Sequence, residues 1–202
     1  NNLSVLVSFA ELEGIIVNGK LDGNKQTFTL LKEWVPYREN ISKEEALKRL
    51  AYKFFSSHGP ATFQDFVWWS GLTINDCRNA MEMITSDFEM VNGRELWMKN
   101  SIISTTSEIE SALLLAPFDE FLVSYKDRSE IFDSEHLRKI VTVNGIFSPT
   151  IMFNGKVIGT WRKKMKKKSH EIVLTFFNKE NKKVVNLFEK ERIRLEEFYK
   201  IS

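Results

Sequence analysis

The sequence contains little of what holds secreted, membrane-spanning or metal-dependent proteins together. Its single cysteine, Cys77, excludes a disulfide within the chain and favours a reducing, cytoplasmic location. No apolar run approaches the roughly 20 residues that span a bilayer, so we expect no membrane partner. The histidines at 58, 136 and 170 lack metal-ligand spacing, and neither a metal nor another cofactor is expected.

An excess of one charge is also absent, because 29 basic and 27 acidic residues leave a net charge of +2. The basic residues are nevertheless concentrated in the run RKKMKKK, which contains Arg162, Lys163, Lys164, Lys166, Lys167 and Lys168. Since these six are part of the +2, the remaining residues together carry −4. The run lies between the predicted strands KVIGTW and HEIVLTFF, which places it at a hairpin end or an exposed edge. It is either a phosphate-binding segment or a solvated charged turn.

Three helices are predicted between residues 42 and 84, each opened by a hydroxyl residue with a carboxylate three positions later. These pairs are Ser42 with Glu45, Thr62 with Asp65, and Thr73 with Asp76. The first helix should end at His58, before Gly59-Pro60, and the third should bury Ile74, Cys77, Met81 and Ile84. A hairpin centred on Asn92-Gly93 follows. This order predicts a winged helix, a helix–turn–helix with an appended hairpin, over residues 41–100.

The two flanking regions are rich in strand signals. Residues 11–31 read as a β-hairpin, and we expect residues 1–40 to end a preceding winged-helix unit. Residues 101–202 contain several β-rich runs and an amphipathic helix over 181–200, which predicts a barrel-like domain with a C-terminal helix. The expected fold class is therefore α+β.

Three separated motifs give the chain a family resemblance: HGPATFQDFVWWSGL, FDEFLVSYKDRS and GIFSPTIMFNGKVIGTW. Together they resemble the AlkZ-type family, a bacterial group of winged-helix proteins that includes alkylpurine and crosslink DNA glycosylases. The match runs from about Glu11 to Trp161. The resemblance implies tandem winged helices and a C-terminal β-barrel arranged around DNA.

The family's glycosylases act through a Gln-hydrophobic-Gln or Gln-hydrophobic-Asp motif in an N-terminal region that this chain does not contain. The only glutamines are Gln26 and Gln64, and neither begins such a motif. If the full-length protein is an enzyme, the resemblance implies a DNA glycosylase whose catalytic residues lie outside these 202 residues. No catalytic residue is therefore assigned within the chain.

The third helix is the candidate recognition helix, with Asn75, Arg78, Asn79 and Glu82 on its outer face. Asn and Arg side chains suit base edges and phosphates. Asp76 and Glu82 oppose the charge of Arg78, which favours packing of this helix against a neighbouring domain over reading of a DNA groove. We expect the basic run to contribute more to DNA affinity than Arg78 does.

Two further features have competing interpretations. Trp68 points away from the inner face of the second helix, so it either packs between domains or stacks on nucleic acid. Asp119, Glu120, Asp127 and Arg128 flank a predicted strand and form either a hydrolytic carboxylate site or a structural ion-pair network, and the network is favoured.

The leading function is that of a DNA-binding winged-helix protein resembling the non-catalytic C-terminal portion of an AlkZ-type DNA repair glycosylase. Its partner would be duplex DNA, held mainly through phosphates by the basic run and Asn75, Arg78 and Asn79. The alternatives are a non-enzymatic transcription or nucleoid factor and a protein-interaction module on the same scaffold.

Overall fold

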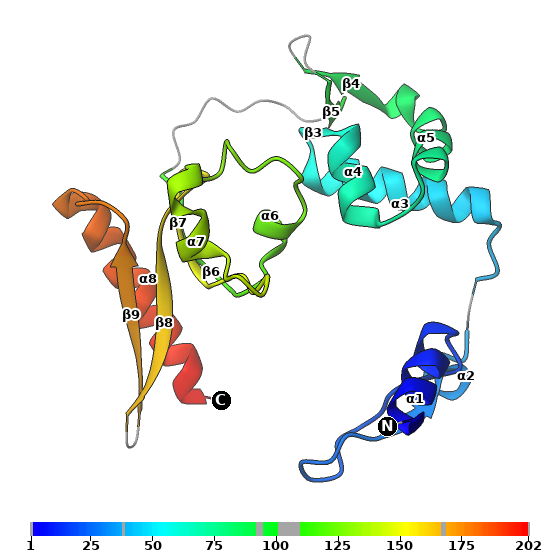
Figure 1. Ribbon diagram of the computed structural model, residues 1–202, viewed down its shortest axis with the longest axis horizontal. Helices are drawn as coiled ribbons and strands as arrows, with labels where there is room; N and C mark the ends of the chain where they lie inside the picture. Colours follow the sequence, from blue (N-terminus) through cyan, green and yellow to red (C-terminus); the bar gives the residue numbers. More distant parts are fainter. Residues whose placement is uncertain (1, 38, 92–94, 101–109, 167–168, 202) are drawn as a thin grey trace. The chain divides into compact units, whose positions relative to one another are not determined.

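The structure is a computed structural model that describes residues 2–37, 39–91, 95–100, 110–166 and 169–201. The chain divides into two compact units, Asn1–Glu45 and Ala46–Ser202. The helices and strands of both units are labelled in Figure 1. No helix among the described residues is long and apolar enough to cross a membrane.

The first unit is built around the predicted hairpin. Its elements are α1 (Asn2–Leu12), β1 (Ile16–Asn18), β2 (Phe28–Leu30) and α2 (Leu31–Trp34). The strands β1 and β2 pair antiparallel with Ile16 opposite Leu30, which confirms the hairpin. The helix α1 was not predicted, and it leaves large apolar side chains such as Leu6 and Phe9 exposed.

The second unit begins with a helical region and a small sheet. Its elements are α3 (Lys43–His58), β3 (Ala61–Thr62), α4 (Phe63–Ser70), α5 (Ile74–Glu82), the 3-10 turn η1 (Thr85–Asp87), β4 (Phe88–Met90) and β5 (Leu96–Lys99). The three strands form an antiparallel sheet in the order β3-β5-β4. The three helices thus lie where the sequence predicted them, and β4 and β5 pair as a hairpin after them, but its predicted turn residues Asn92 and Gly93 lie outside the described residues.

Local side-chain chemistry explains where these helices begin and end. The backbone N–H groups of Glu45, Asp65 and Asp76 donate to the hydroxyls of Ser42, Thr62 and Thr73. The capping box is complete at Thr62, because the Asp65 carboxylate also accepts the Thr62 N–H. Gly71 ends α4 with a φ of 65°, a left-handed conformation that glycine adopts at little cost.

An aromatic core holds α3, α4 and α5 together. Phe54, Phe55 and Phe66 are fully buried, with Phe54 and Phe55 ring centroids 5.1 Å apart in an edge-to-face arrangement. Cys77 and Met81 line the inner side of α5 as predicted, and Ile84 is also buried, although it lies two residues beyond the end of the helix. The prediction was wrong for Ile74, which is 55% exposed because it occupies the first turn of α5, beyond the edge of this core.

The remainder of the second unit is a single sheet with short helices and one long helix. Its elements are β6 (Ala112–Leu115), α6 (Glu120–Val123), the 3-10 turn η2 (Ser134–His136), α7 (Leu137–Ile140), β7 (Thr150–Phe153), β8 (Lys156–Lys166), β9 (Ser169–Phe176) and α8 (Lys182–Ile201). The strands are antiparallel in the order β6-β7-β8-β9. The predicted C-terminal helix over 181–200 is confirmed as α8.

The predicted barrel does not form among the described residues, where β6 and β9 remain at opposite edges of an open sheet. In its place α8 covers one face of the sheet and runs along the β8–β9 hairpin (Figure 1). Val184 and Phe188 of α8 are buried against Ile151, Trp161 and Ile172 of three strands. The helix buries the apolar face that closure of the barrel would otherwise have covered.

The edge strand β9 is also fixed by a polar contact from α8. The Glu196 carboxylate accepts the backbone N–H of Ile172 at 2.8 Å and the Nη1 of Arg192 at 2.8 Å. The Ile172 N–H lowers the pKa of Glu196, and Arg192 adds to this effect. The carboxylate therefore remains charged where it meets the backbone.

Candidate nucleic-acid interface

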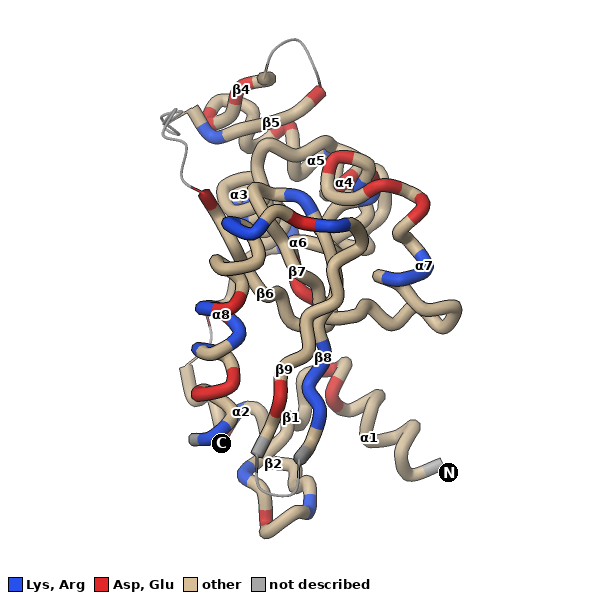
Figure 2. Tube along the Cα trace, turned by 90° about the vertical axis from the view of Figure 1, so that its left-hand side faces the viewer, with Lys and Arg blue, Asp and Glu red and all other residues tan. Residues whose placement is uncertain are grey.

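The basic run lies at the far end of the β8–β9 hairpin, as the sequence predicted. Pairing of β8 with β9 continues to Lys166 opposite Ser169, and Arg162, Lys163 and Lys164 all have exposed side chains. Lys167 and Lys168 lie outside the described residues. Figure 2 shows the blue of this run along β8.

The exposed cations of the hairpin point to both faces of the sheet, because neighbouring side chains of a strand alternate. Lys163 shares the α8 face with Trp161, and its Nζ lies 4.0 Å from the centroid of the Tyr199 ring. Arg162 and Lys164 project from the opposite face, where Lys164 is paired in register with Glu171 of β9. The hairpin is thus a narrow projection with positive charge on each side.

The outer face of α5 carries the other predicted site residues. Asn75, Arg78, Asn79 and Glu82 are exposed, as the helical spacing predicted. Arg78 is partly turned toward its own helix, because its Nη1 lies 3.5 Å from the Asn75 Oδ1. The structure therefore presents these residues on one surface but does not bring them together with the hairpin residues into a single cluster.

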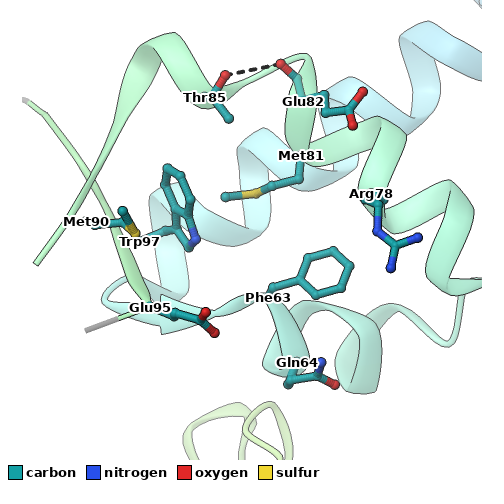
Figure 3. A pocket seen from close by; sticks show the side chains of 9 residues that line it. All are labelled: Phe63, Gln64, Arg78, Met81, Glu82, Thr85, Met90, Glu95 and Trp97. Carbon is teal, nitrogen blue, oxygen red and sulfur yellow. Dashed lines mark hydrogen bonds between the residues drawn. The ribbon is translucent and has the colours of Figure 1, made fainter. Parts of the chain in front are cut away.

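A cavity of about 400 Å³ lies between α4, α5 and the β4–β5 hairpin (Figure 3). Phe63, Met81 and Trp97 form its apolar wall, and the rim carries Arg78 together with the carboxylates of Glu82 and Glu95. The rim has more negative than positive groups, which disfavours the binding of a phosphate here. The acidic residues on α5 predicted the same from the sequence. Sequence reasoning missed this cavity, because it depends on how the hairpin packs beside α5.

The carboxylates near residue 120 accept local hydrogen bonds, and among the described residues no ion pair joins them to Arg128 as the favoured network predicted. They flank the helix α6, so the strand predicted there was wrong. Asp119 caps α6 by accepting the Phe121 N–H, and Asp127 accepts the Ser129 N–H. Both groups are thus used by the local backbone.

Glu120 connects α6 with α3 and α4. Its Oε2 accepts hydrogen bonds from Ser124 Oγ at 2.6 Å and from Trp69 Nε1 at 3.3 Å, and it lies 3.2 Å from His58 Nε2. These contacts lower the pKa of Glu120. The hydrogen bond from Ser124 has the largest effect and that with His58 the next largest. A general acid would need a raised carboxyl pKa, so the arrangement favours a structural role.

Trp68 is not buried as domain packing had predicted, because 53% of its surface is exposed. Its indole is nevertheless held by the β-rich region, since the Nε1 donates to the Val123 carbonyl oxygen at 3.0 Å. Of the two interpretations, packing against a neighbouring region is supported by this contact, but the burial that such packing implies is not observed.

Comparisons with known proteins agree with this architecture. A family model described as DNA glycosylase AlkZ-like matches residues 1–198. An interstrand DNA cross-link repair glycosylase of Streptomyces sahachiroi is 25% identical over 194 residues, which cover 88% of this chain and 50% of that protein. The solved structure of Streptomyces sahachiroi DNA glycosylase AlkZ matches with a TM-score of 0.72 at 24% identity, with 88% of this chain and 50% of that chain covered.

These matches show the same mixed α and β fold, and the chain spans about half the length of the curated relative. The match of the family model over nearly the whole chain confirms the resemblance read from the three motifs. The chain belongs to the AlkZ-like DNA glycosylase family.

Proposed function

We propose that the chain is the DNA-binding portion of a DNA repair glycosylase, and that the end of the β8–β9 hairpin contacts phosphates of duplex DNA. The family and the name of the Streptomyces sahachiroi relative support DNA repair as the role of the whole protein. We assign residues 41–100 to a winged helix, residues 1–40 to the end of a preceding one, and residues 101–202 to a β-rich domain. The order of α3, α4, α5 and the β4–β5 hairpin supports the winged-helix assignment.

The observation that carries the proposal is the placement of charge. Three consecutive basic side chains, Arg162, Lys163 and Lys164, are exposed in the outer half of β8, while the residues outside the basic run sum to −4. Attraction to a polyanion must therefore come from this segment, and Lys or Arg side chains on a strand contact phosphates without reading sequence. We expect strong salt dependence and little sequence preference.

The test is a salt titration of duplex binding by fluorescence anisotropy. Each phosphate contact contributes about −0.9 to the slope of log K against log salt, so three or four contacts give a slope of about −3 to −4. The triple substitution of Lys163, Lys164 and Lys167 by glutamate should abolish binding. Because Lys163 and Lys164 are exposed, the fold should persist in the circular dichroism spectrum.

Two controls separate this proposal from its alternatives. Substitution of the exposed Lys20, Lys48 and Lys53 by glutamate changes the net charge equally and should weaken binding far less. Arg78→Ala should also have a smaller effect than the hairpin substitution. If the triple hairpin substitution leaves affinity unchanged while Arg78→Ala removes it, α5 is the DNA-contacting element and the proposal for the hairpin is wrong.

A further inference from the structure

Four side chains form a continuous aromatic and cationic row on the surface of the second unit, separate from the basic hairpin. The Arg128 Cζ lies 5.6 Å from the centroid of the Trp68 ring and 5.4 Å from that of Phe147. The Phe147 centroid in turn lies 5.9 Å from that of Phe118. We refer to Trp68, Arg128, Phe147 and Phe118 as the stacking row.

Backbone contacts fix the orientation of two members of the stacking row. The Trp68 Nε1 donates to the Val123 carbonyl oxygen at 3.0 Å, and the Arg128 Nε donates to the Leu122 carbonyl oxygen at 2.5 Å. Both acceptors belong to α6, whose Leu122 side chain is fully buried. The indole and the guanidinium are therefore held in place before any ligand arrives, which reduces the entropy lost on binding.

The row remains open to solvent, although large aromatic side chains normally contribute to a core. Trp68 and Phe118 are each 53% exposed. Phe118 also has a φ of 56°, a left-handed conformation that is costly for a residue with a Cβ. The exposed Phe118 ring is thus held at a backbone position where Asn or Gly would be less strained.

Arg128 keeps hydrogen-bonding capacity for a ligand. Its Nε is used by Leu122, but neither terminal nitrogen has a hydrogen bond to any residue that the structure describes. Burial lowers the pKa of Arg128, and the nearby Asp65 opposes this effect, so the guanidinium stays charged at neutral pH. The row thus combines flat apolar faces with a cationic planar donor.

We propose that the stacking row binds an unpaired nucleobase of DNA, with the base against the Trp68 or Phe118 ring and Arg128 donating to its edge or to the adjoining phosphate. Every base has a face that stacks on aromatic side chains, and arginine adds both cation–π contact and phosphate binding. The inference rests on the proposed function and extends it, because the basic hairpin would hold paired DNA through phosphates while the row would hold a base that has left its stack.

The test compares two duplexes that differ by one base and share the same number of phosphates. One carries a single unpaired thymine, and the other carries an abasic spacer at the same position. A base stacked on an aromatic ring is worth on the order of 10-fold in affinity, so the wild-type chain should bind the thymine bulge about 10-fold more tightly.

Phe118→Asn is the decisive variant, because it removes an exposed ring and suits the left-handed backbone. It should reduce the preference for the thymine bulge, as should Trp68→Leu, while both leave binding of the abasic duplex unchanged. Phe198→Ala removes a ring on α8 that is similarly exposed, at 63%, and should leave the preference intact.

The outcomes separate this inference from the proposed function. If Phe118→Asn retains the full preference, or the wild-type chain has none, the stacking row is not a base site, although hairpin-dependent binding of both duplexes would leave the proposed function standing. Absence of binding to either duplex overturns both proposals. Self-association of the wild-type chain that Phe118→Asn abolishes, without any preference between the duplexes, would overturn the base site in favour of a protein interface.

Discussion

Asp65 and Lys126 are joined by a hydrogen bond in which the Asp65 Oδ1 accepts the Lys126 backbone N–H at 2.8 Å. The other oxygen, Oδ2, accepts the N–H and the hydroxyl of Thr62 at 2.9 and 2.7 Å. Only 6% of the Asp65 surface is exposed. One buried carboxylate thus begins α4 and also holds the segment that follows α6.

The substitution Asp65→Asn should lower the free energy of unfolding by about 1–3 kcal/mol, because the amide group must turn an N–H toward one of these donors. Urea denaturation of the purified chain measures the loss. Asp76→Asn is the matched control, since Asp76 begins α5 beside Thr73 and is partly exposed. Its cost should be smaller, below about 1 kcal/mol. Equal losses would show that the Lys126 contact adds no stability.

Glu120 predicts a dependence of stability on acid pH. Its pKa is lowered in the folded chain, so the carboxylate stabilises the fold above the ordinary glutamate pKa of about 4.3, and this contribution is lost as the pH falls below that value. Glu120→Gln should therefore lose less stability between about pH 5 and pH 3 than the wild-type chain does. Ser124→Ala, which removes the strongest hydrogen bond to the carboxylate, should act in the same direction. Thermal unfolding across this range provides the measurement, and superimposable pH profiles would contradict the assignment.

Lys163 and Lys164 are neighbours with different expected roles. Lys163 lies over the Tyr199 ring, so Lys163→Met should lower stability by about 0.5–1 kcal/mol. Lys164 projects from the other face, and Lys164→Met should reduce the salt slope of DNA binding by about 0.9 with little effect on stability. Melting curves and salt titrations of the two variants distinguish these effects. Lys163→Met should change the slope less than Lys164→Met, because the Tyr199 ring restrains Lys163, and equal slope changes would contradict that restraint.

The purified chain should release no base from alkylated DNA. Neither of its glutamines, Gln26 and Gln64, begins the motif that the family's glycosylases use, and the carboxylates of Asp119 and Glu120 already accept structural hydrogen bonds. An assay for abasic sites, compared with heat-inactivated protein, tests this expectation. Base release above that control would contradict the expectation and make Asp119 and Glu120 the candidate catalytic residues.

Elements with local start and stop signals could be predicted from the sequence. The helix α3 follows the Ser42 cap and ends at His58, and the starts of α4 and α5 match their Thr-x-x-Asp pairs. The helix α1 has no acidic residue in its first turn and no basic residue in its last, so it offers neither signal.

Features set by packing between distant segments could not be predicted in the same way. The strand runs predicted β structure correctly, but whether a sheet closes or is covered by α8 depends on contacts such as Phe188 with Ile172. The exposure of Trp68 likewise depends on how α6 approaches α4. Among the candidate site residues, the exposure of Arg162, Lys163 and Lys164 followed from charge alone, whereas the stacking row joins residues far apart in the chain.

The contact between Glu196 and the Ile172 N–H also bears on how the outer edge of the sheet meets other molecules. An outer strand such as β9 offers unpaired backbone groups on which a strand from another molecule can add, and this is a common start of aggregation. At Ile172 the donor is already occupied by a carboxylate, and the charge of that carboxylate repels an incoming backbone carbonyl. Glu196 thereby disfavours the pairing of another strand with β9, and it does so beside the hairpin that we propose must stay free for DNA.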